Sequence, residues 1–300
     1  MNNSLGDKIR ELRKRKHMTQ EELADGICTS VSISRIENGI QMPSSTILER
    51  ILDRLGTSTY EICNIYYKNE QQKEFEEISK SVADLLSSGN ISKAKREIKK
   101  LKAFGNEDAF SQQMILFLEG TVLIHEASEE SRIMLECAIK KTKPNIDLGD
   151  FRESLLSTTE ANIISVLSAA YYKSGDVRKA IRMGEELFSS MNKHESQVKN
   201  YNVILINTAM NLSNYLVVEN RIKEALEYIV QAEEISIKAS ETSLLPEIEF
   251  MKAKILFSLG MKKESKEIVT AVYPYMKLIK KDQFAEITYQ FATEKLKMKL

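Results

Sequence analysis

The sequence has few of the residues that interrupt helices or crosslink chains. Its 300 residues include four prolines, eleven glycines, three cysteines and no tryptophan. Cys28, Cys63 and Cys137 lie far apart and form no CxxC or Cys/His ligand pattern, which indicates reduced thiols rather than a zinc site or a disulfide framework. Because helix breakers are scarce and Leu, Ile, Ala, Glu and Lys are abundant, we expect an all-α protein.

Long apolar stretches are absent as well. Nothing in the sequence approaches the roughly 20 consecutive apolar residues that a membrane-spanning helix needs. The amino-terminal residues MNNSLGDKIREL contain no apolar signal region. We therefore expect a cytoplasmic protein with no membrane partner.

Charge of neither sign dominates, because 43 Lys and Arg balance 43 Asp and Glu. The overall charge therefore gives no general attraction to nucleic acid. Positive charge is concentrated locally instead, on Lys8, Arg10, Arg13, Lys14, Arg15 and Lys16. A local concentration of this kind is compatible with specific DNA binding, in which base contacts select the sequence and phosphate contacts hold the protein in place.

Catalytic patterns are also missing. His17, His125 and His194 are isolated in the sequence, and neither an HExxH motif nor a glycine-rich phosphate loop is present. Pairs of acidic residues are common, but on helices of this composition they are typical of solvated faces. The sequence therefore predicts a protein that is not an enzyme, with no metal and no cofactor.

Residues 19–43, TQEELADGICTSVSISRIENGIQMP, predict two short helices joined by a tight turn. Thr19 and Glu22 have capping-box spacing, so a helix should begin at Thr19. Thr29 or Ser30 should cap a second helix, which residues 38–39 (Asn-Gly) should end. Two short helices with this spacing form a helix-turn-helix, in which the second helix lies in the DNA major groove.

Residues 20–24 (QEELA) and 34–39 (SRIENG) closely resemble the xenobiotic-response-element type of helix-turn-helix that phage repressors share. In that family an arginine seven residues before the position of Gln20 pairs with the glutamate of the SRIEN segment. The resemblance therefore implies an Arg13–Glu37 ion pair that fixes the first helix against the recognition helix. Two separately solvated charges are the alternative.

Further helices should flank this pair. Residues 5–16 should form the first helix, and residues 43–44 (Pro-Ser) should begin another that ends at Gly56. Thr59 is a candidate start for a fifth short helix. The polar run KNEQQK at residues 68–73 marks the domain boundary, which gives a DNA-binding domain at residues 1–67 and a second domain at residues 68–300.

The second domain shows an internal repeat of helix pairs. Residues 171–180, YYKSGDVRKA, strongly resemble the tetratricopeptide repeat, a unit of ~34 residues. Related copies occur at residues 89–94, 220–225 and 260–265, and a degenerate copy lies around residues 120–139. The resemblance implies about five repeats and a capping helix near residues 283–297, stacked into a right-handed superhelix.

The residues expected to contact DNA lie at the start of the recognition helix and beside it. Short side chains at that start should meet base edges and thymine methyl groups, partly through water. Gln20 and Asn38 flank the helix pair and should contact phosphate. For Arg35 two roles stay open, a phosphate contact and a contact with Glu37. The predicted DNA-binding set is Gln20, Thr29, Ser30, Val31, Ser32, Arg35 and Asn38.

A tetratricopeptide superhelix presents the first helix of each pair on its inner surface. Family groove positions, carried onto this sequence, give a predicted peptide-binding set: Asn162, Ser165, Tyr172, Lys173, Asn207, Met210, Asn214, Val217, Phe250, Lys254 and Phe257. An asparagine amide carries both a donor and an acceptor, so it can hold the backbone of an extended peptide without reading its sequence. Asparagines on an unoccupied, solvated surface are the alternative.

A repressor-type helix-turn-helix followed by about five tetratricopeptide repeats resembles the Rap/Rgg/NprR/PlcR/PrgX (RRNPP) family of regulators. The Ile27-Cys28-Thr29 turn is similar to PlcR-like members in particular. The resemblance implies a cytosolic quorum-sensing transcription factor. Such a factor binds a palindromic operator as a homodimer and is controlled by a short, re-imported signalling peptide held in the groove of its repeats.

A different partner for the repeats stays open. The repeat domain of a helix-turn-helix regulator can also bind a folded protein, such as an anti-repressor. Binding of short peptides would favour the first reading, and a stable complex with a folded protein would favour the second.

Overall fold

The computed structural model describes residues 5–56, 70–104, 108–193 and 201–299. Every regular element in these ranges is helical, so the predicted all-α class is confirmed. The chain divides into two compact units, Met1–Ile78 and Ser79–Leu300. The predicted boundary at residue 67 and the predicted helix from Thr59 lie outside the described residues. Each unit is described below by itself.

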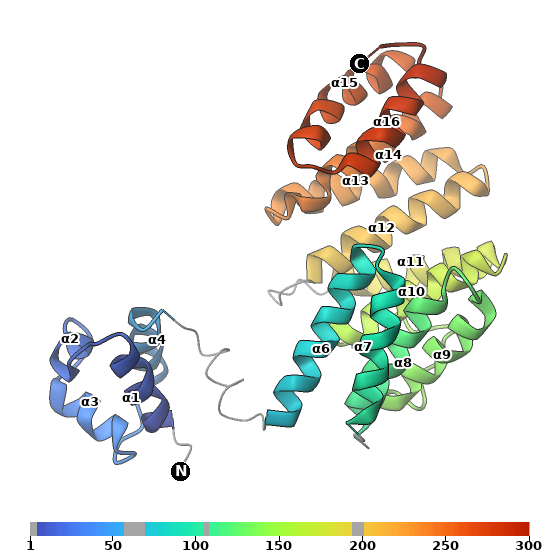
Figure 1. The fold of residues 1–300 in the computed structure, drawn as a ribbon. Helices are drawn as coiled ribbons and strands as arrows, with labels where there is room; N and C mark the ends of the chain where they lie inside the picture. Colours follow the sequence, from blue (N-terminus) through green and yellow to red (C-terminus); the bar gives the residue numbers. More distant parts are fainter. Residues whose placement is uncertain (1–4, 57–69, 105–107, 194–200, 300) are drawn as a thin grey trace. The chain divides into compact units, whose positions relative to one another are not determined.

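In the described residues 5–56 of the first unit, four helices lie together (Figure 1) and pack around a small apolar core. They are α1 (Leu5–Arg15), α2 (Gln20–Ala24), α3 (Ser30–Glu37) and α4 (Ser45–Arg54). The apolar faces of these helices meet in that core, whose buried members are Ile9, Leu23, Ala24, Ile33, Ile36, Ile51, Leu52 and Leu55. Burial of these side chains holds α2 and α3 in the helix-turn-helix arrangement.

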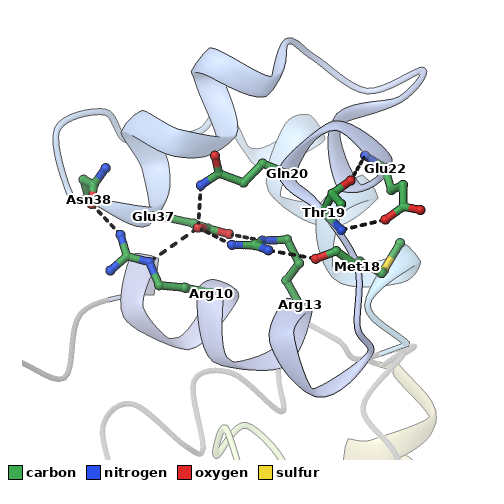
Figure 2. Close-up of polar contacts among 8 residues, drawn as sticks. All are labelled: Arg10, Arg13, Met18, Thr19, Gln20, Glu22, Glu37 and Asn38. Atoms are coloured by element: carbon green, nitrogen blue, oxygen red, sulfur yellow. Dashed lines mark hydrogen bonds and ion pairs between the residues drawn. The ribbon is translucent and has the colours of Figure 1, made fainter.

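Local capping sets the ends of these helices as predicted. The Thr19 amide donates to Glu22 Oε2 at 2.6 Å, and the Glu22 amide donates to Thr19 Oγ1 at 3.1 Å, which completes the capping box (Figure 2). The Thr29 hydroxyl accepts from the Ser32 amide at the start of α3. Gly39 follows α3 with φ of +70°, a left-handed conformation that suits glycine at a helix end.

Close approach of α1 to α3 depends on Gly6. A Cβ atom at this position would collide with the carbonyl oxygen of Ile36 and would lie 2.8 Å from the carbonyl oxygen of Glu37. Both obstacles are backbone atoms, which cannot move aside without moving the recognition helix. Gly6 therefore allows α1 to lie directly against the end of α3.

The second unit is a stack of helix pairs (Figure 1). Along the described chain the pairs are α6 (Glu70–Ser87) with α7 (Ile91–Ala103), α8 (Ala109–Leu123) with α9 (Ser128–Thr142), α10 (Thr158–Lys173) with α11 (Val177–Lys193), α12 (Tyr201–Val218) with α13 (Ile222–Lys238), and α14 (Leu245–Ser258) with α15 (Lys262–Leu278). A short 3₁₀ turn, η1 (Thr242–Leu244), precedes α14, and α16 (Asp282–Glu294) closes the stack. In the described residues the helices thus form five pairs and one closing helix. The amino-terminal part of α6 belongs to the first unit by its contacts.

First helices of neighbouring pairs contact one another along one side of this stack. Contacts join α8 to α10, α10 to α12 and α12 to α14. The residues predicted to bind a peptide were placed on this row of helices. The row is therefore the part of the repeat unit on which the candidate site must be sought.

A repeated small-residue contact holds the two helices of a pair together. In four pairs a buried serine hydroxyl donates to a backbone carbonyl of the partner helix. These bonds are Ser131 to Gly120 (2.6 Å), Ser168 to Ala180 (3.3 Å), Ser213 to Ala225 (2.8 Å) and Ser265 to Ala253 (2.8 Å). Small side chains at the crossing let the helices approach closely, and the bond satisfies a hydroxyl that has no access to water.

No helix of the described residues is both long enough and apolar enough to cross a bilayer.

Candidate DNA-binding and ligand-binding surfaces

A buried carboxylate lies at the centre of the helix-turn-helix unit. Glu37, at the end of α3, is 1% exposed. Arg13 of α1 contacts it with two nitrogens, Nε at 2.6 Å from Oε1 and Nη2 at 2.9 Å from Oε2. Gln20 of α2 donates from Nε2 to Oε2 at 2.8 Å (Figure 2). The ion pair that the repressor resemblance implied is therefore present, and it ties together three helices.

Arg10 extends this network toward the surface. Its Nε donates to Glu37 Oε2 at 3.4 Å, and its Nη2 donates to Asn38 Oδ1 (Figure 2). Arg13 also donates from Nη1 to the Met18 carbonyl at 2.8 Å, which fixes the connection between α1 and α2. Sequence reasoning missed Arg10, although Arg10 and Arg13 are three residues apart on α1 and so share one face of that helix.

The network keeps Glu37 ionised in the folded protein. Burial by itself raises the pKa of this carboxyl. Hydrogen bonds from Arg13 and Gln20 and the charge of Arg13 act in the opposite direction, and together they hold the Glu37 pKa below its ordinary value. The site is therefore a charged cluster whose anion is surrounded by two guanidinium groups and an amide.

The start of α3 presents short side chains and one exposed apolar residue. Val31 is 58% exposed. Thr29 caps the helix, and its hydroxyl lies 2.9 Å from the Ser32 hydroxyl. Because the first turn of α3 contains no acidic side chain, nothing there repels phosphate from the helix end. This surface has the chemistry expected of a recognition helix that reads thymine methyls and base edges.

The residues beside α3 have internal partners. The Gln20 amide donates to Glu37, and the Asn38 side-chain oxygen accepts from Arg10. Arg35 is exposed and is not among the residues that contact Glu37 in the described part of the chain. Of its two predicted roles, the contact with Glu37 is therefore wrong, and the phosphate contact stays a prediction. Contacts of Gln20 and Asn38 with phosphate also stay predictions.

The repeat unit contains a cavity of about 370 Å³ where α12, α14 and α16 meet. Its walls combine aromatic and aliphatic side chains with two amide or hydroxyl groups and two lysines. The lining residues are Asn214, Val217, Met251, Lys254, Ile255, Phe257, Ser258, Phe291 and Lys295. This volume lies near the lower end of the roughly 300–1,000 Å³ that is typical of small-ligand sites.

Part of the predicted groove set lies in this cavity. Asn214 and Val217 of α12 and Lys254 and Phe257 of α14 line it together. The other predicted residues with solvent access are outside its lining: Asn162, Tyr172 and Lys173 on α10, and Asn207 and Met210 on α12. The structure therefore brings together the carboxyl-terminal part of the predicted set.

Two of the predicted groove residues are buried, contrary to expectation. Ser165 on α10 lies at the contact with α12, where its hydroxyl is 3.4 Å from the Thr208 hydroxyl. Phe250 on α14 packs against Val272 and Met276 of α15. Both side chains occupy seams between neighbouring helices, so neither presents a free surface to a ligand.

Several lining residues were not predicted. Met251 and Ile255 lie on α14, Phe291 lies on α16, and Lys295 directly follows the last residue of α16, whereas Ser258 of α14 is one of the family groove positions and was expected. The Phe291 ring makes edge-to-face contacts with Phe250 and Phe257, with centroids 5.7 and 5.6 Å apart. The spacing on α14 was visible in the sequence. The contribution of α16 was not, because it depends on how the capping helix packs.

Groups suited to metal binding do not occur in the described ranges, since no three His, Cys, Asp or Glu side chains come together there. Cys28 and Cys137 are free thiols. Cys63 lies outside the described residues. The helix-turn-helix face and the cavity between α12, α14 and α16 are therefore the two candidate sites considered for function.

Known proteins share both parts of this architecture. Residues 9–62 match the family model described as "Helix-turn-helix". No curated protein sequence matches the chain significantly. The whole chain is similar to solved structures of regulators at 16–20% identity, a level at which the likeness shows a shared fold alone.

Three of these structures illustrate the likeness. PlcR from Bacillus thuringiensis, crystallised with the peptide PapR7 and DNA, is 16% identical with a TM-score of 0.72, over 95% of this chain and 99% of PlcR. ComR from S. thermophilus, in complex with DNA and its signalling peptide ComS, is 20% identical with a TM-score of 0.60, over 95% and 97%. The SHP pheromone receptor Rgg2 from Streptococcus dysgalactiae is 16% identical with a TM-score of 0.54, over 95% and 97%.

Proposed function

We propose that this chain is a peptide-responsive transcriptional regulator of the Rap/Rgg/NprR/PlcR/PrgX type that acts in the cytoplasm. Its helix-turn-helix unit binds a palindromic operator as a homodimer. Its repeat unit binds a short, re-imported signalling peptide on the row of first helices. Peptide binding changes how the two DNA-binding units of the dimer are held, and so changes operator affinity.

The observation that carries the proposal is the cavity between α12, α14 and α16. Two of its three helices, α12 and α14, are ones that the repeat resemblance assigns to a groove, and four of the predicted residues line it. An asparagine beside aromatic and aliphatic walls suits a peptide, whose backbone needs amide partners and whose side chains need apolar space. The fold shared with PlcR and ComR, each crystallised with a peptide and DNA, supports the same function.

DNA binding rests on the first unit. Glu37 and its partners fix α1, α2 and α3 as one rigid block, so α3 can enter a major groove without changing shape. A two-fold dimer would place two such helices on half-sites separated by about one helical turn of DNA or a multiple of it. Coupling of ~1–3 kcal/mol between peptide and operator is typical of allosteric proteins.

Calorimetry on the full chain tests the proposal. The ligands are synthetic peptides taken from the carboxyl-terminal ends of small open reading frames beside the gene. Binding of one of them at micromolar strength or better supports peptide reception. If none binds and the chain instead forms a stable complex with a folded protein in pull-down experiments, the repeats serve a protein partner and the proposal is wrong.

A further inference from the structure

The cavity between α12, α14 and α16 is apolar in its walls and positive in its charge. Phe257 and Phe291 form an edge-to-face pair in its wall, with ring centroids 5.6 Å apart. The charged residues that line it are Lys254 and Lys295, and the lining includes no acidic side chain. A third cation lies close by, because Lys262 Nζ is 5.9 Å from the centre of the Phe257 ring.

Neither lining lysine has an acidic partner among the described residues. In the part of the chain that the structure describes, Lys254 and Lys295 form no ion pair with an acidic side chain. Lys254 instead points its Nζ toward the Phe250 ring, 5.8 Å from the centroid. The neighbouring Lys252 on the same helix differs, since it pairs with Glu233 and Glu249. The positive charge at the cavity is therefore uncompensated, whereas the charge two residues away is paired.

An apolar pocket flanked by free cations fits a ligand that has a carboxylate next to a large apolar group. The ammonium groups would bind the carboxylate by charge-assisted hydrogen bonds, and the Asn214 amide can donate one more. The aromatic pair would enclose the apolar group. A purely apolar ligand would leave the lysines without a partner, and a cationic ligand would be repelled.

We propose that this cavity binds the carboxyl-terminal residue of the signalling peptide. The last side chain, large and apolar, lies against Phe257 and Phe291, and the terminal carboxylate lies between Lys254 and Lys295. This inference rests on the proposed function, because it assumes a peptide ligand. About 370 Å³ accommodates one such residue and part of its neighbour, so the rest of the peptide must lie outside the cavity.

The assignment fixes the direction of the peptide. Its carboxyl end is at α14 and α16, and the preceding residues run across α12 toward α10. Asn207 and Asn162 then face the backbone of those earlier residues. A carboxylate on a glutamate side chain beside an apolar residue has the same chemistry as a terminal carboxylate, so the test must separate these two sources.

Fluorescence anisotropy on the full chain provides the test. The first probe is fluorescein-labelled Gly-Ala-Ala-Ala-Leu-Phe with a free carboxyl terminus, and the second is the same peptide as a carboxyl-terminal amide. The third probe is labelled Gly-Ala-Ala-Ala-Glu-Phe-amide, which carries its carboxylate on a side chain. The free acid should bind with a dissociation constant about tenfold lower than that of either amide. A hydrogen bond to a charged group is roughly twice as strong as a neutral one, and this difference in free energy corresponds to about a tenfold change in affinity.

Lysine variants locate the carboxylate. Lys254→Gln and Lys295→Gln should each weaken binding of the free acid about tenfold and leave binding of the amide unchanged. Lys266→Gln, which removes an exposed lysine of α15 away from the cavity, is the matched control and should change neither. Because all three lysines are exposed, circular dichroism should show the same helix content in every variant.

Each remaining outcome overturns the inference. Equal binding of free acid and amide removes the role of the terminal carboxylate. Tighter binding of the glutamate peptide than of the free acid assigns the lysines to a side-chain carboxylate instead. If a neighbouring-gene peptide binds by calorimetry while the lysine variants have no effect, the inference is wrong and the proposed function stands. If no peptide of either kind binds, both are wrong.

Discussion

The two units of this protein differ in how they arrange most of their buried polar groups. The helix-turn-helix unit concentrates them in one charged cluster, in which Glu37 contacts Arg10, Arg13 and Gln20. The repeat unit bonds four buried serines separately to backbone carbonyls, one in each of four helix pairs, and also holds a smaller cluster in which Thr142 contacts Gln113 and Glu160. The cluster fixes one rigid geometry, and one substitution at Glu37 would disrupt all of its contacts. Each serine bond joins the two helices of one pair, so the loss of one bond affects that pair alone.

The largest effect should come from removing the charge at the centre of the cluster. Glu37→Gln leaves Arg13 and Arg10 without their counter-ion, and breaking a buried ion pair in this way costs about 3–5 kcal/mol. Hydrogen exchange followed by mass spectrometry should show faster exchange in α1 to α3 and unchanged exchange in α10 to α15. Equal protection of α1 to α3 in variant and parent would show that the cluster does not hold this unit together.

A pair of glycine substitutions sharpens the same comparison. Gly6→Ala places a methyl group against backbone carbonyls of α3, whereas Gly184→Ala places one 2.7 Å from the Leu212 side chain of the repeat unit. A side chain can change rotamer, whereas a backbone carbonyl cannot move aside. We therefore expect the free energy of unfolding to fall by about 3 kcal/mol in Gly6→Ala and by about 1 kcal/mol in Gly184→Ala. Urea denaturation of each variant measures its free energy of unfolding, and hydrogen exchange shows whether the affected helices are the ones that lose protection. A larger loss for Gly184→Ala would contradict the argument.

The two units should also respond oppositely to pH. At Glu249 of α14, burial and a hydrogen bond with Glu233 outweigh the charge of Lys252 and raise the pKa to about 7. Because the pKa of Glu249 is higher in the folded than in the unfolded protein, Glu249 contributes fully to stability below the unfolded pKa near 4.5. This contribution is lost as pH rises through 7. The pKa of Glu37 is lowered instead. The contribution of Glu37 to stability is therefore present above the unfolded carboxyl pKa and is lost as pH falls through the folded one.

Glu249→Gln isolates the repeat-unit part of this response. The amide cannot ionise, so the variant should match the parent near pH 4.5 and exceed its unfolding free energy by about 1–2 kcal/mol at pH 8. Thermal denaturation at both pH values measures the difference. A variant that is less stable than the parent at pH 8 would mean that the ionised carboxylate stabilises α13 and α14.

Sequence patterns predicted the parts of the molecule that depend on local chemistry. The Thr19 capping box, the start of α3 at Ser30 and the stop at residues 38–39 need only neighbouring residues. The repeat pairs were visible because each copy has a small residue at the helix crossing. The Arg13–Glu37 pair was predicted from the repressor resemblance rather than from spacing.

The features that sequence patterns did not predict depend on packing between segments that are distant in the sequence. Arg10 joined the cluster because Gly6 lets α1 lie close to the end of α3. Ser165 is buried because α12 of the next pair covers it, and Phe250 is buried because it packs against α15 of its own pair. Lys295 and Phe291 reached the cavity through the capping helix, for which the repeat pattern assigns no groove positions.

The smallest structural change should separate the two functions. Ser32→Ala removes one hydroxyl from the start of α3, so it should weaken operator binding by about 1 kcal/mol and leave peptide affinity unchanged. Asn207→Ala should do the reverse. Anisotropy with labelled operator and labelled peptide measures both. An unchanged peptide affinity in Asn207→Ala would show that the predicted register on α12 is wrong.

The central claim is that a peptide on the repeats sets the affinity of the helix-turn-helix units for DNA. Its most direct test is the dissociation constant of the full chain for a palindromic operator selected from random duplexes, measured with and without a saturating peptide that binds by calorimetry. We predict a change of about 5- to 150-fold, the range of typical allosteric coupling. The same dissociation constant at saturating peptide would contradict the account.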